Sequence, residues 1–324
     1  MILYIETQAA HFPQTEFIIS KFPRAEIVWI KHYKNLFDKN ISYETNDCLI
    51  VARLTGKSLL PVPETYGYGS HSYFLRTQLN CVFDCAYCYL KGAFRNDFPV
   101  YFVNYDEIKE QITHEIDRVR ETGYTGQIWI YPSNRTDLVG SEHIGSFHKQ
   151  FVPFFETLEN VMIESRTKSI MMKPLLDLWI IPQNTELAFS LNAQEIIDQF
   201  ERATPPLDKR IKALNQMLDA WWKVGLRLMP LLPIPGYLAI YERFFQQLKN
   251  QIAIDSCSSL FFGWFLLTTN DQKQMQKKSP ESALRLMLKQ HNGILLRTGE
   301  QERNELYQLI RKYFPMAQVS MDEI

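Results

Sequence analysis

Short apolar runs that alternate with amphipathic stretches, from about residue 71 onward, are the feature that most limits how this chain can fold. The predicted strands cover residues 73–78, 127–131, 161–166, 186–191, 226–232 and 259–267. The clearest predicted helices cover residues 105–123, 141–159 and 207–225, the last of them with Gly225 as its stop. Strands that alternate with helices predict a parallel sheet with right-handed crossovers, either open or closed into a barrel. Six such units are too few for an eight-stranded barrel.

The chain is expected to have three parts. Residues 1–70 look like an N-terminal α/β cap, in which MILYIE and IVWIK are predicted strands, and residues 71–268 carry the alternating pattern. Residues 269–324 are expected to form a basic loop followed by helices. The stretch 271–289 contains five basic residues, which fit a local phosphate-binding face about as well as a solvated helix face: Lys273, Lys277, Lys278, Arg285 and Lys289.

Composition narrows the class of protein. Hydrophobic residues make up 46% and charged residues 22% of the 324 residues, which is ordinary for a globular protein. The formal charge of −1 gives no global attraction to nucleic acid. The longest apolar run is far shorter than the roughly 18 residues of a membrane span, and no signal peptide is apparent. An odd count of five cysteines argues against a disulfide framework, so we expect a cytoplasmic protein with no membrane partner.

Three of the five cysteines lie in the eight residues CVFDCAYC, as Cys81, Cys85 and Cys88. Thiolates suit iron–sulfur clusters, zinc or copper(I). A structural zinc site needs four protein ligands, and Cys48 and Cys257 are distant in sequence. Three thiolates on a [4Fe–4S] cluster would leave one iron open for chemistry. A non-catalytic module that binds zinc or an electron-transfer cluster is the alternative.

The CxxxCxxC spacing resembles the signature of the radical S-adenosylmethionine (SAM) enzymes. That resemblance implies a partial (β/α)₆ barrel, with an N-terminal α/β cap and a C-terminal helical segment in this chain. It also implies a [4Fe–4S] cluster on the three cysteines, whose fourth iron binds SAM. The reduced cluster would cleave SAM to a 5′-deoxyadenosyl radical, and an electron donor such as flavodoxin or ferredoxin would be needed.

Further motifs resemble the spore photoproduct lyases, which split a thymine dimer joined through a methyl group. The motifs, in the family's order, are CAYCYL, IYPSNRTDLVGSEHIG (130–145), ESRTKS (164–169) and FSLNAQEIIDQFERATPPLDKRIKAL (189–214). The resemblance implies a radical SAM lyase that repairs a photoproduct in damaged DNA. A radical SAM enzyme that acts on a different, non-DNA substrate is the first alternative.

The same resemblance assigns roles to individual residues. Lys168 would hold the carboxylate of SAM, a task suited to a compact ammonium group. Thr136 and Ser190 would form hydrogen bonds to SAM, and Tyr87 would lie near its adenine. Thr136 could equally belong to a helix cap with Asp137. His71, His143 and His148 show no pairing at ligand spacing, so ordinary polar roles are expected for them.

One position departs from the family pattern. Asn134, with Ser133 beside it, stands where spore photoproduct lyases carry a cysteine that returns a hydrogen atom to the product radical. The amide N–H of Asn134 and the alcohol O–H of Ser133 are bonds too strong for that task. Cys257, or a tyrosine such as Tyr87 or Tyr89, could donate the hydrogen instead. The radical could also be quenched along another path, or the substrate could differ. The candidate catalytic residues are therefore Tyr87, Tyr89 and Asn134.

Overall fold

The computed structural model describes residues 1–37, 47–63, 71–94, 96–278, 283–292, 295–314 and 319–321. Its chain divides into two compact units. The first unit consists of Met1–Val82, Phe94–Ser165 and Lys173–Thr185, and the second of Phe83–Ala93, Arg166–Met172 and Glu186–Ile324. The predicted boundary at residue 70 lies at the end of a segment, 64–70, outside the described residues. The division into a cap, a barrel and a C-terminal part stays a prediction.

A five-stranded sheet forms the N-terminal part of the first unit, in the order β2-β1-β3-β8-β6. Its strands are β1 (Ile2–Glu6), β2 (Glu26–Ile30), β3 (Cys48–Ala52), β8 (Val100–Phe102) and β6 (Gln78–Leu79). The first four are parallel and β6 runs antiparallel to β8. Helix α1 (Pro13–Lys21) connects β1 to β2, so the two strands predicted in residues 1–70 are confirmed.

The other strands of the first unit are β4 (Leu59–Pro61), β5 (Ser72–Leu75), β9 (Ile128–Tyr131) and β10 (Val161–Thr167). Strands β5, β9 and β10 pair in parallel, and β4 pairs antiparallel with β5. Helices α3 (Tyr105–Glu121) and α5 (Phe147–Phe155) pack on them. Isoleucines spaced four residues apart put one face of α3 in the core: Ile108, Ile112 and Ile116. Each such side chain contributes about 1.5–3 kcal/mol when fully buried.

The helix predicted over 141–159 is two helices, α4 (Glu142–Gly145) and α5, with a break at Ser146. Ser146 adopts a left-handed backbone conformation with φ of 50°. Tertiary hydrogen bonds hold the break, because the Gly145 carbonyl accepts from the Tyr105 hydroxyl at 2.7 Å and from Gln14 Nε2 at 2.9 Å. The single-helix prediction was therefore wrong, since amphipathic spacing alone does not show such a break.

The second unit contains the parallel strands β11 (Thr185–Ser190), β13 (Lys223–Leu231), β14 (Ser259–Trp264) and β18 (Val319–Met321). Its main helices are α7 (Gln194–Phe200), α8 (Leu207–Asp219), α9 (Tyr237–Gln251) and α11 (Glu300–Tyr313). The expectation that Gly225 ends a helix was wrong: α8 ends at Asp219, and Gly225 lies inside β13. A Cβ on Gly225 would come within 2.6 Å of Glu186 Oε1, so close packing, not a turn, explains this glycine.

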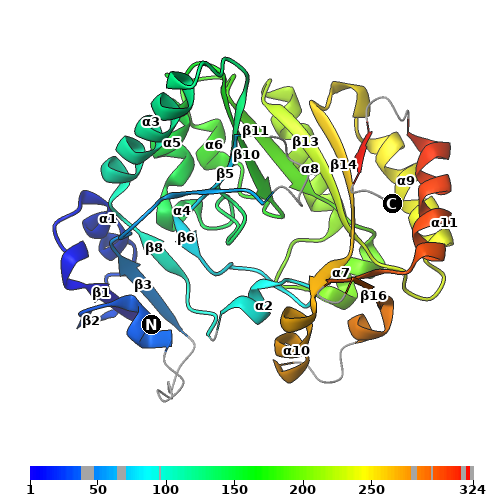
Figure 1. Ribbon diagram of the computed structural model, residues 1–324, viewed down its shortest axis with the longest axis horizontal. Helices are drawn as coiled ribbons and strands as arrows, with labels where there is room; N and C mark the ends of the chain where they lie inside the picture. The colour runs from blue at the N-terminus through cyan, green and yellow to red at the C-terminus, as the bar shows by residue number, and fades with distance from the viewer. Residues whose placement is uncertain are drawn as a thin grey trace. The chain divides into compact units, whose positions relative to one another are not determined.

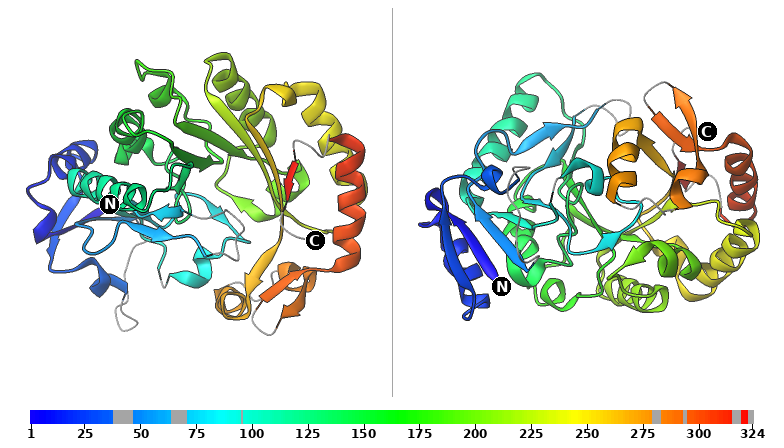
Figure 2. Two further views of the ribbon diagram at one scale, coloured as in Figure 1. Left: turned by 45° about the horizontal axis from the view of Figure 1, so that its top comes forward. Right: turned by 90° about the horizontal axis from the view of Figure 1, so that it is seen from below.

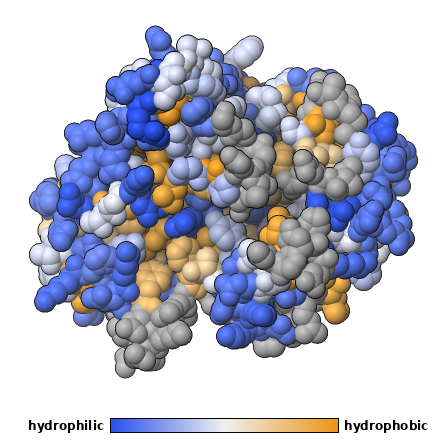
Figure 3. Space-filling model, in the orientation of Figure 1, coloured by the Kyte–Doolittle hydropathy of each residue, from blue (hydrophilic) through white to orange (hydrophobic). Residues whose placement is uncertain are grey.

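The C-terminal part contains helices, as expected, and also a small sheet that the sequence did not predict. Strands β15 (Leu266–Thr268), β17 (Leu295–Thr298) and β16 (Leu288–Asn292) are antiparallel, and α10 (Thr269–Lys278) follows β15. Helix α11 lies beside α9 (Figures 1 and 2). The outer surfaces of α3 and α11 are mostly hydrophilic, as Figure 3 shows.

All six strands predicted for the partial barrel are present. Strands β5, β9 and β10 correspond to the first three predictions, and β11, β13 and β14 to the last three. The mixed α/β class is thereby confirmed. Among the described residues, no helix has the length and apolar character needed to cross a membrane.

Candidate active site

Residues 83–88 of the cysteine motif form a short turn that contacts residues 200–202 of the second unit. Strand β7 (Asp84–Cys85) pairs antiparallel with β12 (Glu201–Arg202), which places Cys85 opposite Glu201. The Ala86 amide then donates to the Phe200 carbonyl at 2.7 Å, and the Cys88 amide donates to the Cys85 carbonyl at 3.1 Å. Cys85 and Cys88 therefore lie on one hydrogen-bonded turn, which leads into the short helix α2 (Leu90–Ala93).

Cys81 belongs to the first unit, four residues before Cys85. Within the part of the chain that the structure describes, no three His, Cys, Asp or Glu side chains are gathered as a metal-binding group. The assignment of the three cysteines as ligands stays a prediction. Their chemistry fits it, because a soft donor set of three thiols is what an iron–sulfur cluster with one open iron requires.

Burial and a nearby positive charge shift the pKa values of Cys85 and Cys88 in opposite directions. Burial raises the pKa of the Cys85 thiol to about 11 and also raises the pKa of Cys88. The ammonium group of Lys168 lowers the pKa of both thiols, and so favours the thiolate form that binds metals. Lys168 also lies over Tyr87, with its Nζ 5.6 Å from the ring centroid. The structure thus brings together three predicted site residues of the second unit, Cys85, Cys88 and Lys168, around Tyr87.

A buried ion pair between Glu201 and Arg210 is hydrogen-bonded to Tyr87 in the cysteine turn. The Arg210 Nη2 donates to Glu201 Oε2 at 2.6 Å, and both side chains are 0% exposed. The Tyr87 hydroxyl donates to the other oxygen of Glu201, and burial, then the negative charge of Glu201, raise the pKa of Tyr87. Arg210 Nη1 also donates to the Ser190 carbonyl at 3.2 Å. Arg210 and Glu201 therefore connect Ser190, at the end of β11, to the turn that carries Cys85.

Sequence analysis assigned no role to Glu201 or Arg210, although both stand in the quoted block 189–214. An acidic and a basic residue nine positions apart give no local signal of pairing. The two tyrosines of the motif differ in accessibility: Tyr87 is buried, whereas Tyr89 is 40% exposed.

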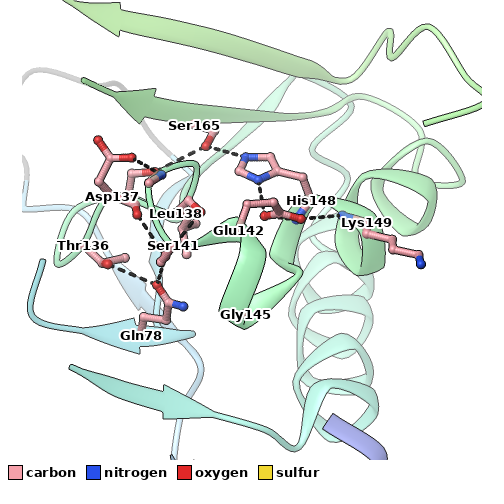
Figure 4. Close-up of polar contacts among 12 residues, drawn as sticks. Gln78, Thr136, Asp137, Leu138, Ser141, Glu142, Gly145, His148, Lys149 and Ser165 are labelled. Atoms are coloured by element: carbon pink, nitrogen blue, oxygen red, sulfur yellow. Dashed lines mark hydrogen bonds and ion pairs between the residues drawn. The ribbon is translucent and has the colours of Figure 1, made fainter. Parts of the chain in front are cut away.

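In the first unit, the segment after β9 is held by polar contacts (Figure 4). The Thr136 hydroxyl donates to Gln78 Oε1 at 3.1 Å, and the Ser141 hydroxyl lies 2.8 Å from the same atom. The Asp137 carboxylate accepts from the Gly140 amide at 2.8 Å, as in a capped turn. Asn134 is partly buried in this segment. Thr136 therefore has its hydroxyl hydrogen in use, and its oxygen keeps a lone pair.

A second buried network begins at Glu142 (Figure 4). Glu142 Oε2 lies 2.7 Å from Nδ1 of His148 and accepts from the His148 amide at 3.0 Å. Nε2 of His148 lies 2.8 Å from the Ser165 hydroxyl, which lies 3.4 Å from the hydroxyl of Ser133. Glu142, His148 and Ser165 are all buried.

Two arginines follow the parallel strands β5 and β9 in the first unit, and sequence analysis did not single them out. Arg76 donates to the Lys57 carbonyl through Nη2, whereas its Nε is buried and has no hydrogen-bond partner among the described residues. Burial lowers the pKa of Arg76, and the positive charge of Arg135 lowers it further. The guanidinium groups of Arg76 and Arg135 are therefore close enough for their charges to interact.

The family model for spore photoproduct lyase matches residues 2–322. The chain belongs to the spore photoproduct lyase family. A spore photoproduct lyase of Geobacillus sp. (strain Y412MC61) is 25% identical over 98% of this chain and 97% of its own length. The spore photoproduct lyase of Bacillus subtilis (strain 168) is 24% identical over 88% of this chain and 84% of its own length.

Solved structures of spore photoproduct lyases share the fold. One, complexed with dinucleoside spore photoproduct, has a TM-score of 0.82 at 20% identity and covers 99% of this chain and 98% of its own. A double mutant with bound AdoMet (SAM) and dinucleoside spore photoproduct has a TM-score of 0.80 at 20% identity, covering 100% and 98%. The predicted α/β fold of the radical SAM type is confirmed. Members of the spore photoproduct lyase family are radical SAM lyases, which use a [4Fe–4S] cluster and SAM.

Proposed function

We propose that this protein uses a [4Fe–4S] cluster and SAM to repair a DNA photoproduct of the spore photoproduct type. The observation that carries the proposal is the intact cysteine motif, folded beside Lys168, in a chain that matches the family model over residues 2–322. Cys81, Cys85 and Cys88 would hold the cluster. When bound, the cluster and SAM supply a 5′-deoxyadenosyl radical that removes a hydrogen atom from the substrate. A one-electron donor such as flavodoxin or ferredoxin would reduce the cluster.

The chain's own residues would bind and orient SAM. Lys168 would bind the carboxylate of SAM through its ammonium group. Tyr87 would offer its ring to the adenine, because its hydroxyl is already used by Glu201. Thr136 and Ser190 would form hydrogen bonds to SAM, and Thr136 would do so as an acceptor because its hydrogen is donated to Gln78.

Damaged DNA is the proposed substrate, in keeping with the dinucleoside spore photoproduct held by related solved structures. Arg76 and Arg135 would contact a backbone phosphate of that DNA, since a guanidinium group can donate two parallel hydrogen bonds to a phosphate. The basic stretch 271–289 is a weaker candidate, because Lys289 Nζ lies 3.5 Å from Glu302 Oε1. The side chains of Lys278 and Arg285 lie outside the described residues.

In this proposal Asn134 takes the place of the family's hydrogen-donating cysteine, so the final hydrogen donor differs. Tyr89 is the preferred tyrosine in this proposal, because it is 40% exposed whereas Tyr87 is buried and bonded to Glu201. Tyr89→Phe would then lower the yield of repaired thymine without changing SAM cleavage.

The test is anaerobic reconstitution with iron and sulfide, followed by dithionite and SAM. 5′-Deoxyadenosine is then measured with and without UV-irradiated DNA, together with the thymine that is restored. Cys85→Ala should lose the bound iron, whereas the matched variant Cys257→Ala should keep it. Formation of 5′-deoxyadenosine with no repair would assign the enzyme to a non-DNA substrate. An assembled cluster that yields no 5′-deoxyadenosine would contradict the radical SAM activity.

A further inference from the structure

A chain of four polar side chains runs from Glu142 to Ser133 through the first unit, and the proposed repair chemistry does not use it. His148 and Ser165 are 0% exposed and Glu142 is 3% exposed. Burying polar groups is costly unless each one is hydrogen-bonded, so a network this deep has few alternative arrangements. Its outer member, Ser133, is partly exposed two residues after β9 ends. The carboxyl ends of parallel strands are where α/β folds place their ligands.

The carboxylate of Glu142 sets the direction of the hydrogen bonds. An ionised carboxylate only accepts, and Glu142 already accepts from the amides of His148, at 3.0 Å, and Lys149, at 3.1 Å. The third contact, 2.7 Å to Nδ1 of His148, must therefore also be donated, so the ring hydrogen lies on Nδ1. In the neutral imidazole Nε2 is then an acceptor.

The acceptor role of His148 Nε2 then determines which way the hydroxyl groups of Ser165 and Ser133 donate. Ser165 donates its single hydroxyl hydrogen to Nε2 of His148, across 2.8 Å. It can then only accept from Ser133, whose oxygen is 3.4 Å away. Ser133 points its hydrogen inward, and its remaining lone pair faces away from the network. The hydroxyl of Ser133, which would otherwise be free to donate or accept, is fixed as an acceptor.

We propose that Ser133 is a specificity-determining residue that accepts a hydrogen bond from an N–H group of the substrate, and that Glu142, His148 and Ser165 are positioning residues that hold it as an acceptor. For the substrate of the proposed function, on which this assignment rests, the matching group is the imide N3–H of thymine. The N3-methylated form of the lesion lacks this hydrogen, so a methyl group would face the lone pair of Ser133. The network would therefore favour the N3–H form.

The first test needs no cofactor and no activity. Nitrogen-15 NMR of histidine-labelled full-length protein reports which ring nitrogen carries hydrogen, and His148→Gln identifies the signal of His148. We expect hydrogen on Nδ1 and none on Nε2 at neutral pH. Hydrogen on Nε2, whether the ring is neutral or charged, would reverse the direction of the chain and overturn the proposal.

The second test measures binding of dinucleoside spore photoproduct and of its N3-methylated form to the reconstituted protein with SAM. The wild type should prefer the N3–H form. Ser133→Ala should weaken binding of that form by about 3- to 10-fold and remove the preference, whereas Ser133→Thr should keep both. Ser165→Ala should cost about 2- to 5-fold, but nothing further in the Ser133→Ala background, because the two act through one hydrogen bond. Ser20→Ala, at an exposed position of helix α1, is the matched control.

The outcomes separate this inference from the proposed function. If Ser133→Ala binds both forms as the wild type does, the role of Ser133 is wrong while the repair function stands. If the wild type cleaves SAM but does not bind the dinucleoside, the DNA substrate is wrong, and the assignment of Ser133 to thymine falls with it. Additive losses in the double variant would show that Ser165 acts only as part of the core.

Discussion

Replacement of Arg210 by methionine should destabilise the second unit more than any surface change of the same kind. Arg210 is 0% exposed and makes four hydrogen bonds through its guanidinium group. They join it to Glu201 Oε2 at 2.6 Å, the Thr204 hydroxyl at 2.6 Å, the Pro205 carbonyl at 2.8 Å and the Ser190 carbonyl at 3.2 Å. Methionine fills similar volume but leaves the buried Glu201 carboxylate without its counter-charge.

The size of the effect follows from that stranded charge. Removing one partner of a buried ion pair costs about 3–5 kcal/mol, because the remaining ion has no water to solvate it. That is a large share of the roughly 5–15 kcal/mol that holds a typical domain folded. The matched control is Arg243→Met, since Arg243 pairs with Glu195 at 2.6 Å but the two side chains are 62% and 42% exposed. An exposed pair contributes only about 0–1 kcal/mol.

Urea unfolding followed by circular dichroism measures the free energy of unfolding of Arg210→Met and of Arg243→Met. The loss in Arg210→Met should appear as a lower midpoint of the unfolding transition. Adding Glu201→Gln should restore about half of it, because the amide oxygen still accepts from Tyr87 and the stranded charge is gone. If the free energies of unfolding of Arg210→Met and Arg243→Met differ by less than about 1 kcal/mol, burial does not make the Arg210 pair more important, and the reasoning is refuted.

Three further predictions concern the cofactor, acid stability and DNA. Lys168→Ala should weaken SAM binding by about 10- to 100-fold at unchanged iron content, by equilibrium dialysis, whereas Lys173→Ala on the exposed helix α6 (Lys173–Leu176) should not. Hydrogen bonds from Arg118 hold the pKa of Glu115 below 4.5. The Glu115 carboxylate stabilises the fold fully above its unfolded-state pKa, and this stabilisation is lost as pH falls through its lower folded-state pKa. The free energy of unfolding should therefore fall less steeply with acid in Glu115→Gln, as measured by acid unfolding. Arg135→Gln should weaken binding to all DNA sequences alike and reduce the salt dependence of log K by about one charge, and an unchanged salt slope would argue against a phosphate contact.

Local spacing in the sequence was enough to predict the cofactor chemistry and most of the framework. CxxxCxxC is a property of eight consecutive residues, and the strands that became β5, β9, β10, β11, β13 and β14 were visible as apolar runs. These features survive folding because they depend on residues close together in the chain.

Where the prediction failed, a contact from far along the chain decided the outcome. Gly225 has the position of a helix stop, but the side chains of Glu186 and Ser259 approach it so closely that only glycine fits in the strand. The helix over 141–159 breaks at Ser146, where the preceding carbonyl is held by Tyr105 and Gln14. Periodicity contains no information about such partners.

The polar networks depend even more on tertiary structure. Glu201 and Arg210 are ordinary charged residues in the sequence, and only burial makes them a pair whose loss is costly. Ser133 became an acceptor only because folding placed Ser165, 32 residues away, beside it and His148 beside Ser165. The sequence alone thus determined which cofactor this chain is built to hold. The tertiary structure decided which side chains are buried together. Burial makes the loss of a charged partner costly and leaves a hydroxyl group with one possible hydrogen-bonding role, because water is not there to replace the missing partner.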